Sequence, residues 1–432
     1  MTFELTTRAI KISLAGVAGA ALVCGGLAQT AISSTPTSAS DPIGGWSESW
    51  GAAMQRPTPG TEDNGPNWSM KGFADQSVRQ VIRLSGGGDR VRIRLSNVYG
   101  TKPLKIAGAA VGMSAGGAKV WPGTIKTLKF HGAASTVVKP GAELASDPVA
   151  LPTKPLQKLA VTLRFTEPTG PATFHRFTTQ EAYRASGDHL TEPVSAAFAK
   201  STNSWYYLTG VDVAGGAGIQ GTVVTFGDSL IDGVGSTGDE RIADGLAERL
   251  AAQGRPITVI NSGIGGNRIL GDTSCYGDKA PTRFRRDVLD RPGVRSVIIH
   301  LGANDIAAAK IEDPCLPKGG TLPTARQLIE GHRALIRAAH ARGIKAIGAT
   351  ILPLKGALFP IWSPEAENVR DEVNRWIRTS GEYDAVLDVD RVMADRTDPD
   401  RPWLGYVFED GLHPNDAGYQ AIVRAVPLGA LS

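Results

Sequence analysis

Five short apolar runs in the second half of the chain constrain its fold more than any other feature. Each is of buried-strand type, and amphipathic helical patterns separate most of them, such as the stripe of Ile242, Leu246 and Leu250. Strands that alternate with helices predict a parallel sheet. We therefore expect a doubly wound, flavodoxin-like α/β domain over residues 220–432, with a five-stranded sheet and helices on both faces. The runs are Thr222–Phe226, Ile257–Ile260, Val294–Leu301, Ile344–Leu352 and Ala385–Val389.

The first half of the chain shows the period-two pattern of strands. Gln80–Ser85 and Val91–Ser96 alternate aliphatic with polar side chains, and the glycine-rich stretch 86–89 separates them, which predicts a β-hairpin. Later apolar runs are short and are broken by Pro and Gly, and no long helical pattern occurs. We expect an all-β sandwich or jelly roll over residues 45–213, joined to the α/β domain by the glycine-rich stretch 215–218.

The amino terminus has the composition of a secretory signal peptide. Arg8 and Lys11 precede an uncharged stretch at 12–28, and a Ser/Thr/Ala-rich tail follows. We expect residues 1–39 to be removed, with cleavage after Ala39 or nearer Ala31, and the mature protein to be secreted without stable membrane insertion. An uncleaved membrane anchor is the alternative, because the uncharged stretch is long for a signal peptide.

Two cysteines, Cys275 and Cys315, remain after removal of residues 1–39. An even count in a chain bound for an oxidising compartment predicts that they form a disulfide. The alternative is two unrelated buried thiols.

Composition excludes a collagen, a coiled coil, a polytopic membrane protein and a wholly disordered chain. The chain is 41% hydrophobic and 20% charged, as expected of a globular protein. Its 46 Lys plus Arg against 42 Asp plus Glu give a net charge of +4 without a basic block, so we expect no nucleic-acid partner. Its 432 residues exceed the 250 to 300 or so that one core usually holds, which agrees with two domains.

Small polar residues follow three of the expected strands directly. Ser229 comes after the first strand, on a turn that can expose a nucleophilic hydroxyl, although for the Gly-Asp-Ser tripeptide alone a plain helix cap would be the commoner explanation. Gly266 lies after the second strand and Asn304 after the third. The backbone amides of Ser229 and Gly266, with the side-chain amide of Asn304, form a candidate oxyanion hole at the sheet edge where such folds bind ligands.

Asp410 and His413 lie after the last strand. Their spacing of three residues lets the carboxylate reach the imidazole, which would fix the ring and stabilise its protonated form after it takes a proton from Ser229. Capping of a helix that has Pro414 in its first turn is the alternative. Asp388 and Asp390, at the end of the fifth strand, are further candidates for the carboxylate.

These four clusters, taken in order, resemble the four sequence blocks of the SGNH or GDSL hydrolase superfamily. The blocks are Gly227–Leu230 (GDSL), Gly263–Arg268 (GIGGNR), Gly302–Asp305 (GAND) and Asp410–Pro414 (DGLHP). The resemblance covers about residues 220–432. It implies Ser229 as nucleophile, His413 as general base and acid, Asp410 as its orienting carboxylate, and Ser229, Gly266 and Asn304 as oxyanion donors, without metal or organic cofactor. The first half is similar to the β-rich amino-terminal domain of secreted two-domain bacterial members.

Several other motifs fit a structural role better than a chemical one. Ser114 lies in a G-x-S-x-G pattern, but a turn-like stretch follows it where a nucleophile elbow needs a helix. We expect His300 to be a core residue with satisfied hydrogen bonds and Asp305 to brace its loop, and no His set has metal-ligand spacing. Aromatic residues in a β-sandwich are more often core or edge filler than glycan-binding residues. The glycan-binding candidates in the first half are Trp46, Trp50, Trp68, Trp121 and Trp205-Tyr206-Tyr207.

These observations predict a secreted serine esterase, acting as a monomer on a small-molecule or polysaccharide ester. Short acyl groups are favoured because no long apolar lid is evident; acetylated carbohydrate, lipid and aryl esters stay open. The alternatives are a non-catalytic secreted carbohydrate- or surface-binding protein and an acyltransferase.

Overall fold

The computed structural model describes residues 45–60, 65–215, 218–316 and 319–431, and residues 42–432 form one compact unit. The expected signal peptide lies outside the described residues. The described residues contain two large hydrophobic cores, one built from residues between Trp50 and Val213 and the other from residues between Val223 and Leu431, and a third cluster of only Ala118, Ala185 and Phe198. Each large core falls within one of the two ranges expected to be domains, and the division into domains stays a prediction.

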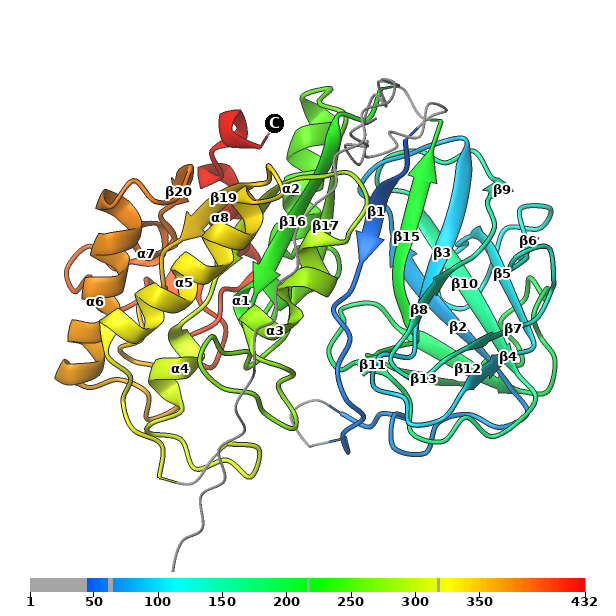
Figure 1. The fold of residues 1–432 in the computed structure, drawn as a ribbon, viewed down its shortest axis with the longest axis horizontal. Coiled ribbons are helices and arrows are strands. Elements are labelled where there is room, and N and C mark those ends of the chain that lie inside the picture. The colour runs from blue at the N-terminus through cyan, green and yellow to red at the C-terminus, as the bar shows by residue number, and fades with distance from the viewer. Residues whose placement is uncertain (1–44, 61–64, 216–217, 317–318, 432) are drawn as a thin grey trace, which may run out of the picture. The chain divides into compact units, whose positions relative to one another are not determined.

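The second core surrounds a parallel sheet, as the sequence predicts. Its strand order is β17-β16-β18-β19-β20, the doubly wound order in which the first strand lies between the second and third (Figure 1). The carboxyl ends of β16, β17 and β18 therefore lie side by side. The strands are β16 (Gly221–Gly227), β17 (Ile257–Gly263), β18 (Val294–His300), β19 (Lys345–Ala349) and β20 (Ala385–Leu387).

Helices pack against this sheet through the apolar stripes seen in the sequence. The helix α2 contacts β17 and α8, whereas α5 contacts β19 and α6. Thr324 and Gln327 form a capping box at the start of α5, and Ser363 caps α6. The helices are α1 (Ser229–Asp232), α2 (Ile242–Ala252), α3 (Ala280–Phe284), α4 (Ala303–Ala307), α5 (Ala325–His340), α6 (Pro364–Thr379), α7 (Val389–Met393) and α8 (Asp416–Ala425), with a π-helical segment η1 (Arg285–Leu289) after α3 and short 3-10 turns η2 (Leu404–Tyr406) and η3 (Leu428–Ala430).

The first half is mostly antiparallel and contains two larger sheets. One has the order β1-β15-β3-β8, with β9 also paired to β3, and the other β13-β12-β2-β10-β5-β6. Two short pairs, β11 with β14 and β4 with β7, complete it. The strands are β1 (Ser47–Gly51), β2 (Gln76–Arg83), β3 (Arg90–Ser96), β4 (Leu104–Ile106), β5 (Gly108–Met113), β6 (Lys126–Leu128), β7 (Thr136–Val138), β8 (Glu143–Ala145), β9 (Val149–Ala150), β10 (Lys158–Phe165), β11 (Phe174–His175), β12 (Ala182–Ser186), β13 (Lys200–Thr202), β14 (Trp205–Tyr206) and β15 (Leu208–Ala214).

The predicted hairpin is wrong. The two strands exist, but β2 pairs with β10 and β12, whereas β3 pairs with β15, β8 and β9. The glycine-rich stretch 86–89 therefore leads from one sheet to the other. The alternation of apolar and polar residues along a strand indicates which side chains face the core, but it does not identify the neighbouring strand.

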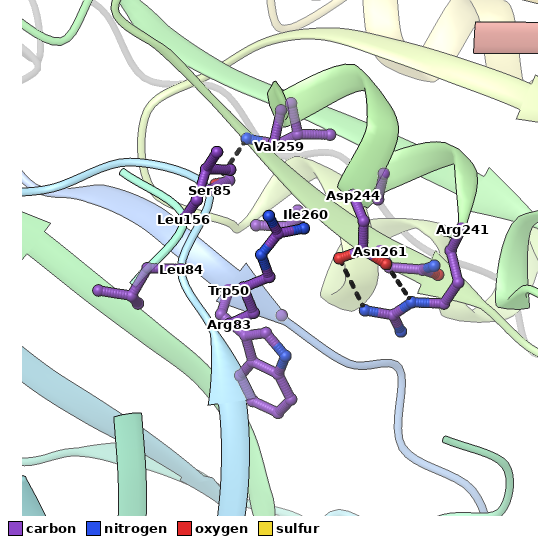
Figure 2. Close-up of a pocket in the computed structure, with 13 residues that line it drawn as sticks. Trp50, Arg83, Leu84, Ser85, Leu156, Arg241, Asp244, Val259, Ile260 and Asn261 are labelled. Atoms are coloured by element: carbon purple, nitrogen blue, oxygen red, sulfur yellow. Dashed lines mark hydrogen bonds and ion pairs between the residues drawn. The ribbon is translucent and has the colours of Figure 1, made fainter. Parts of the chain in front are cut away.

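Contacts between the two cores are partly polar. The hydroxyl of Ser85 accepts a hydrogen bond from the backbone N–H of Val259 in β17 at 2.9 Å, and nearby Arg241 pairs with Asp244 at 2.7 Å (Figure 2). The cavity beside them measures only about 10 Å³; the glycan-binding candidate Trp50 lines it, but none of the predicted catalytic or oxyanion residues does. This region is therefore a packed joint.

The aromatic residues of the β half are mainly core. Trp121 is 59% exposed, and Trp46 lies half-buried under the guanidinium of Arg92 at 4.3 Å from its ring. The core-filler interpretation applies to the buried members, which are Trp50, Trp68, Trp205, Tyr206 and Tyr207.

The disulfide between Cys275 and Cys315 is present, with 5.7 Å between the Cα atoms. It confirms the predicted pairing and joins the loop after β17 to the loop after α4. Within the described ranges, none of the helices has the length and apolar composition to cross a bilayer.

Candidate active site

Ser229 lies just beyond the carboxyl end of β16, two positions after Gly227, the last residue of the strand. It is the first residue of α1, and the Asp228 carboxylate caps this turn by accepting a hydrogen bond from the Leu230 N–H. The strand approaches β18 so closely that a Cβ at Gly227 would lie 2.2 Å from the His300 carbonyl oxygen. Glycine at 227 therefore permits the strand spacing that presents Ser229.

His413 and Asp410 lie in the segment before α8. The imidazole Nε2 is 2.7 Å from the Ser229 hydroxyl oxygen, across 184 positions of sequence, and Nδ1 is 2.5 Å from an Asp410 carboxylate oxygen. The three residues are thus in direct contact. The helix-capping alternative needed Pro414 in the first turn of a helix, and this is wrong: α8 begins at Asp416, and Asn415 caps it.

The electrostatics of Asp410 favour its ionised form. Burial pushes its pKa upward, but hydrogen bonds from His413 and from the backbone N–H groups of Leu412 and His413 hold the pKa below its usual range. A carboxylate facing Nδ1 places the ring hydrogen on Nδ1. The lone pair of Nε2 is then left to accept the hydrogen of the Ser229 hydroxyl.

Gly266 and Asn304 line the same cavity as Ser229 and His413. Gly266 has a φ of +80°, and a Cβ there would lie 2.4 Å from the ring of Tyr276, so both backbone conformation and space require glycine. The Asn304 amide nitrogen donates to the carbonyl of Asn267 at 3.2 Å. This bond orients the amide, and its nitrogen carries a second hydrogen for a substrate oxygen.

The cavity has a volume of about 300 Å³ and combines an apolar wall with a few polar groups. Arg176, from the β half, lies on one side with its guanidinium 4.9 Å from the centre of the Tyr276 ring. The Tyr276 hydroxyl donates to Asp313, and burial together with this carboxylate raises the pKa of Tyr276 to about 12. An apolar wall suits an aliphatic group of the substrate. The residues of this wall include Leu230, Val234, Ile311, Leu352, Leu354 and Ile361.

Sequence reasoning missed several residues that hold the site together. The buried guanidinium of Arg283 donates to the carbonyls of Gly227 and Ser262 and to the side chain of Asn267, so it joins the ends of β16 and β17 and the loop that follows β17. Asp232, at the end of α1, accepts from the Gly265 N–H. In the sequence Asp232 is a charged residue among apolar neighbours, whereas Arg283 lies in a stretch that also contains Arg285 and Arg286, and neither pattern reveals their partners.

Asp305 braces a loop as predicted, but the loop is the neighbouring one. Its two oxygens accept from the backbone N–H groups of Ile269 and Leu270. Burial raises the pKa of Asp305 to about 6. Its role is therefore to hold the segment that follows Gly266.

His300 is buried, as predicted, but its hydrogen bonds are only half satisfied. Nδ1 lies 2.8 Å from Asp228, whereas Nε2 has no hydrogen-bond partner among the described residues. The ring also lines the cavity.

The other candidates lie in different surroundings. Asp388 and Asp390 both form ion pairs with Arg378. Ser114 lies in a β-bridge with Val120, and a turn follows it, as the sequence predicts. Among the residues that the structure describes, no group of three or more His, Cys, Asp or Glu side chains is arranged to hold a metal ion.

Comparison with known proteins gives a match over the α/β half. Residues 225–421 match the GDSL-like Lipase/Acylhydrolase family. No curated protein sequence matches the chain.

Solved structures similar to the chain each cover about half of it. A lipase/acylhydrolase from Enterococcus faecalis is 20% identical, with a TM-score of 0.36 and coverage of 48% of this chain and 92% of its own. An acetyl xylan esterase from Geobacillus stearothermophilus is 19% identical, with a TM-score of 0.38 and coverage of 48% and 93%. A GDSL-like lipase from Bacteroides thetaiotaomicron is 18% identical, with a TM-score of 0.36 and coverage of 49% and 88%. The family match over residues 225–421 and the parallel sheet agree with the motifs, and they support the resemblance of the α/β half to the GDSL-like hydrolases.

Proposed function

We propose that the protein is a secreted serine esterase that hydrolyses carboxylic esters through Ser229, His413 and Asp410. The observation that carries the proposal is the continuous contact from the Ser229 hydroxyl to His413 Nε2, at 2.7 Å, and from His413 Nδ1 to Asp410, at 2.5 Å. This is the arrangement of a nucleophile, its base and the group that orients the base. A non-catalytic binding protein has no need of it.

The reaction proceeds in two rounds. His413 Nε2 takes the hydroxyl proton as Ser229 Oγ attacks the ester carbonyl carbon, and the carbonyl oxygen becomes an oxyanion. The Ser229 and Gly266 backbone N–H groups and the Asn304 amide stabilise this charge. His413 then gives its proton to the leaving alcohol, which departs from an acyl-Ser229 intermediate. Water, activated in turn by His413, releases the carboxylic acid and restores Ser229.

The cavity supports a small ester with an aliphatic acyl group. Leu352, Leu354 and Ile361 provide an apolar wall beside Ser229. The sequence-based preference for short acyl chains stays a prediction, and so does the choice among carbohydrate, lipid and aryl alcohols. Rates with p-nitrophenyl esters from C2 to C16 measure the acyl preference, and product analysis with competing alcohols distinguishes hydrolysis from acyl transfer.

Secretion is supported by the composition of residues 1–39 and by the Cys275–Cys315 disulfide, a bond that persists in oxidising compartments. The mature amino terminus of exported protein would identify the cleavage site.

The test of the proposed chemistry is Ser229→Ala. We expect turnover of p-nitrophenyl acetate to fall by about 10⁴-fold or more, because the nucleophile is lost. A fluorophosphonate probe should label the wild-type protein at Ser229 and leave the variant unlabelled, while the melting temperature stays within a few degrees. Retained turnover in Ser229→Ala would contradict the proposal.

A further inference from the structure

A histidine of the β half reaches the short helix that carries Ser229. His175 lies in β11 and is only 2% exposed, and its Nε2 is 3.0 Å from Oδ1 of Asp232. Asp232 is the last residue of α1, the helix that Ser229 begins, and is likewise 2% exposed. This bond links the β half to the backbone of the active site.

The other oxygen of Asp232 holds the loop that carries Gly266. Asp232 Oδ2 accepts a hydrogen bond from the Gly265 N–H at 2.8 Å. Gly265 immediately precedes Gly266, whose N–H is one of the three oxyanion donors in the proposed function. A donor contributes to an oxyanion hole only if it is held in position before charge develops. Asp232 supplies such an anchor one residue away.

The partners of His175 determine where its hydrogens lie. Nδ1 is 2.8 Å from the carbonyl oxygen of Ala53, which can only accept, so Nδ1 carries a hydrogen. The Nε2 to Asp232 contact also needs a hydrogen, because otherwise two lone pairs would face each other. His175 therefore donates at both ring nitrogens, or shares the second proton with the carboxyl group.

The ring of His175 has little freedom to move. It stacks on Trp205 with 5.6 Å between ring centres and 28° between planes, and β11 pairs with β14 at these two residues. Neither His175 nor Asp232 lines the cavity that contains Ser229. Both therefore act on the substrate only through other residues.

We propose that His175 is a positioning residue of the oxyanion hole, and that the β half completes the active site by fixing Asp232 and, through it, the Gly265–Gly266 turn. The inference rests on the proposed function. Removal of one oxyanion donor costs about 10²- to 10³-fold in kcat in a well-studied protease. A donor that is loosened rather than removed should cost less, about 10- to 100-fold.

Two substitutions separate the two bonds of His175. The amide nitrogen of His175→Gln reaches about as far as Nε2 and can still donate to Asp232. The shorter side chain of His175→Asn places its amide nitrogen near Nδ1, where it can donate only to the Ala53 carbonyl. We expect kcat for p-nitrophenyl acetate to stay within about fivefold of wild type in the Gln variant and to fall about 10- to 100-fold in the Asn variant, with KM little changed in both.

The rates are measured per active site, titrated with a fluorophosphonate, so that loss of folded protein is not counted as loss of catalysis. Inhibition by a boronic acid, which forms a tetrahedral anion on the serine, should weaken in the Asn variant by about the same factor as kcat/KM falls. A purely structural role would lower the melting temperature and the number of titrated sites, and would leave kcat per site and boronate affinity unchanged.

If neither His175 variant folds, Asp232 offers the same comparison from the other side. Asp232→Asn can accept from Gly265 and donate to a neutral His175, whereas Asp232→Ala loses both bonds. We expect near-normal kcat per site in the first and the 10- to 100-fold loss in the second. Equal kcat per site in the Gln and Asn variants, or in the Asp232 pair, overturns the inference while Ser229→Ala remains inactive. Activity in Ser229→Ala overturns the proposed function instead.

Discussion

At the scale of single residues, the site depends on a few hydrogen bonds whose direction is fixed by chemistry. Asp410 accepts from the N–H groups of Leu412 and His413 with one oxygen and faces His413 Nδ1 with the other. The first two bonds are local and follow from the spacing of the residues. The third orients the ring toward Ser229, so the carboxylate links a local turn to a contact between distant segments.

Asp410→Asn tests this role without disturbing the turn, because the Asn oxygen can still accept from both backbone N–H groups. The amide no longer favours a hydrogen on Nδ1, so His413 loses the tautomer that accepts from Ser229. We expect kcat to fall by about 10³- to 10⁴-fold, as in other triads, with the melting temperature nearly unchanged. Steady-state kinetics on p-nitrophenyl acetate measure it. A fall below tenfold would mean that another group orients His413.

At the scale of elements, loops that leave neighbouring strands of the parallel sheet are tied together. Arg283 joins the carbonyls at the ends of β16 and β17. The Cys275–Cys315 disulfide and the bond from Tyr276 to Asp313 join the loop after β17 to the loop after α4. Tyr276 lies against Gly266, so these cross-links also support the Gly265–Gly266 turn.

The double variant Cys275→Ser, Cys315→Ser removes one of these ties. The cysteines are 40 positions apart, and a loop of this length predicts a loss of about 4 kcal/mol in the free energy of unfolding in the chain-entropy model. Urea unfolding should show this loss, and wild-type protein treated with reductant should match the variant. Titration of two free thiols in native, unreduced protein would contradict the prediction.

At the scale of the whole molecule, a buried polar contact connects the two halves of the chain. Glu48 in β1 is fully buried, and its carboxylate lies 3.3 Å from Arg291, which follows η1. Burial raises the pKa of Glu48 to about 8, and the negative charges of Asp212 and Glu143 act in the same direction. The positive charges of Arg291 and Arg94 lower this pKa but do not outweigh burial. The joint between the cores therefore contains a carboxyl group that resists ionisation.

This raised pKa makes stability depend on pH. Between the ordinary value of 4.5 and about 8, Glu48 is protonated in the folded chain and ionised in the unfolded chain. The folded state then holds more protons, so this contribution to stability falls as pH rises through that window, by at most about 1.4 kcal/mol per pH unit. Glu48→Gln lacks the effect. We expect its melting temperature, relative to wild type, to rise steadily from pH 5 to pH 8; a constant difference would refute the prediction.

Much of the catalytic half could be predicted from sequence because its signals are local. Buried strands read as apolar runs and helices as apolar stripes, since each pattern reflects which side chains face the core. The positions of Ser229, Gly266 and Asn304 after three strands then followed from the rule that parallel strands end at one edge. The disulfide followed from the count of cysteines.

Other features depended on contacts between distant segments, which periodicity does not encode. The pattern around 80–96 determined that two strands form, but only the tertiary structure decided that they join different sheets. Tertiary structure likewise decided the roles of His175 and Arg176, which lie far in sequence from the strands of the parallel sheet. His175 contacts Asp232, and Arg176 lines the cavity that contains Ser229. The sequence alone thus determined the elements of the α/β half and the candidates for the reactive side chains. The tertiary structure decided their neighbours, because pairing and burial of polar groups are settled by long-range packing.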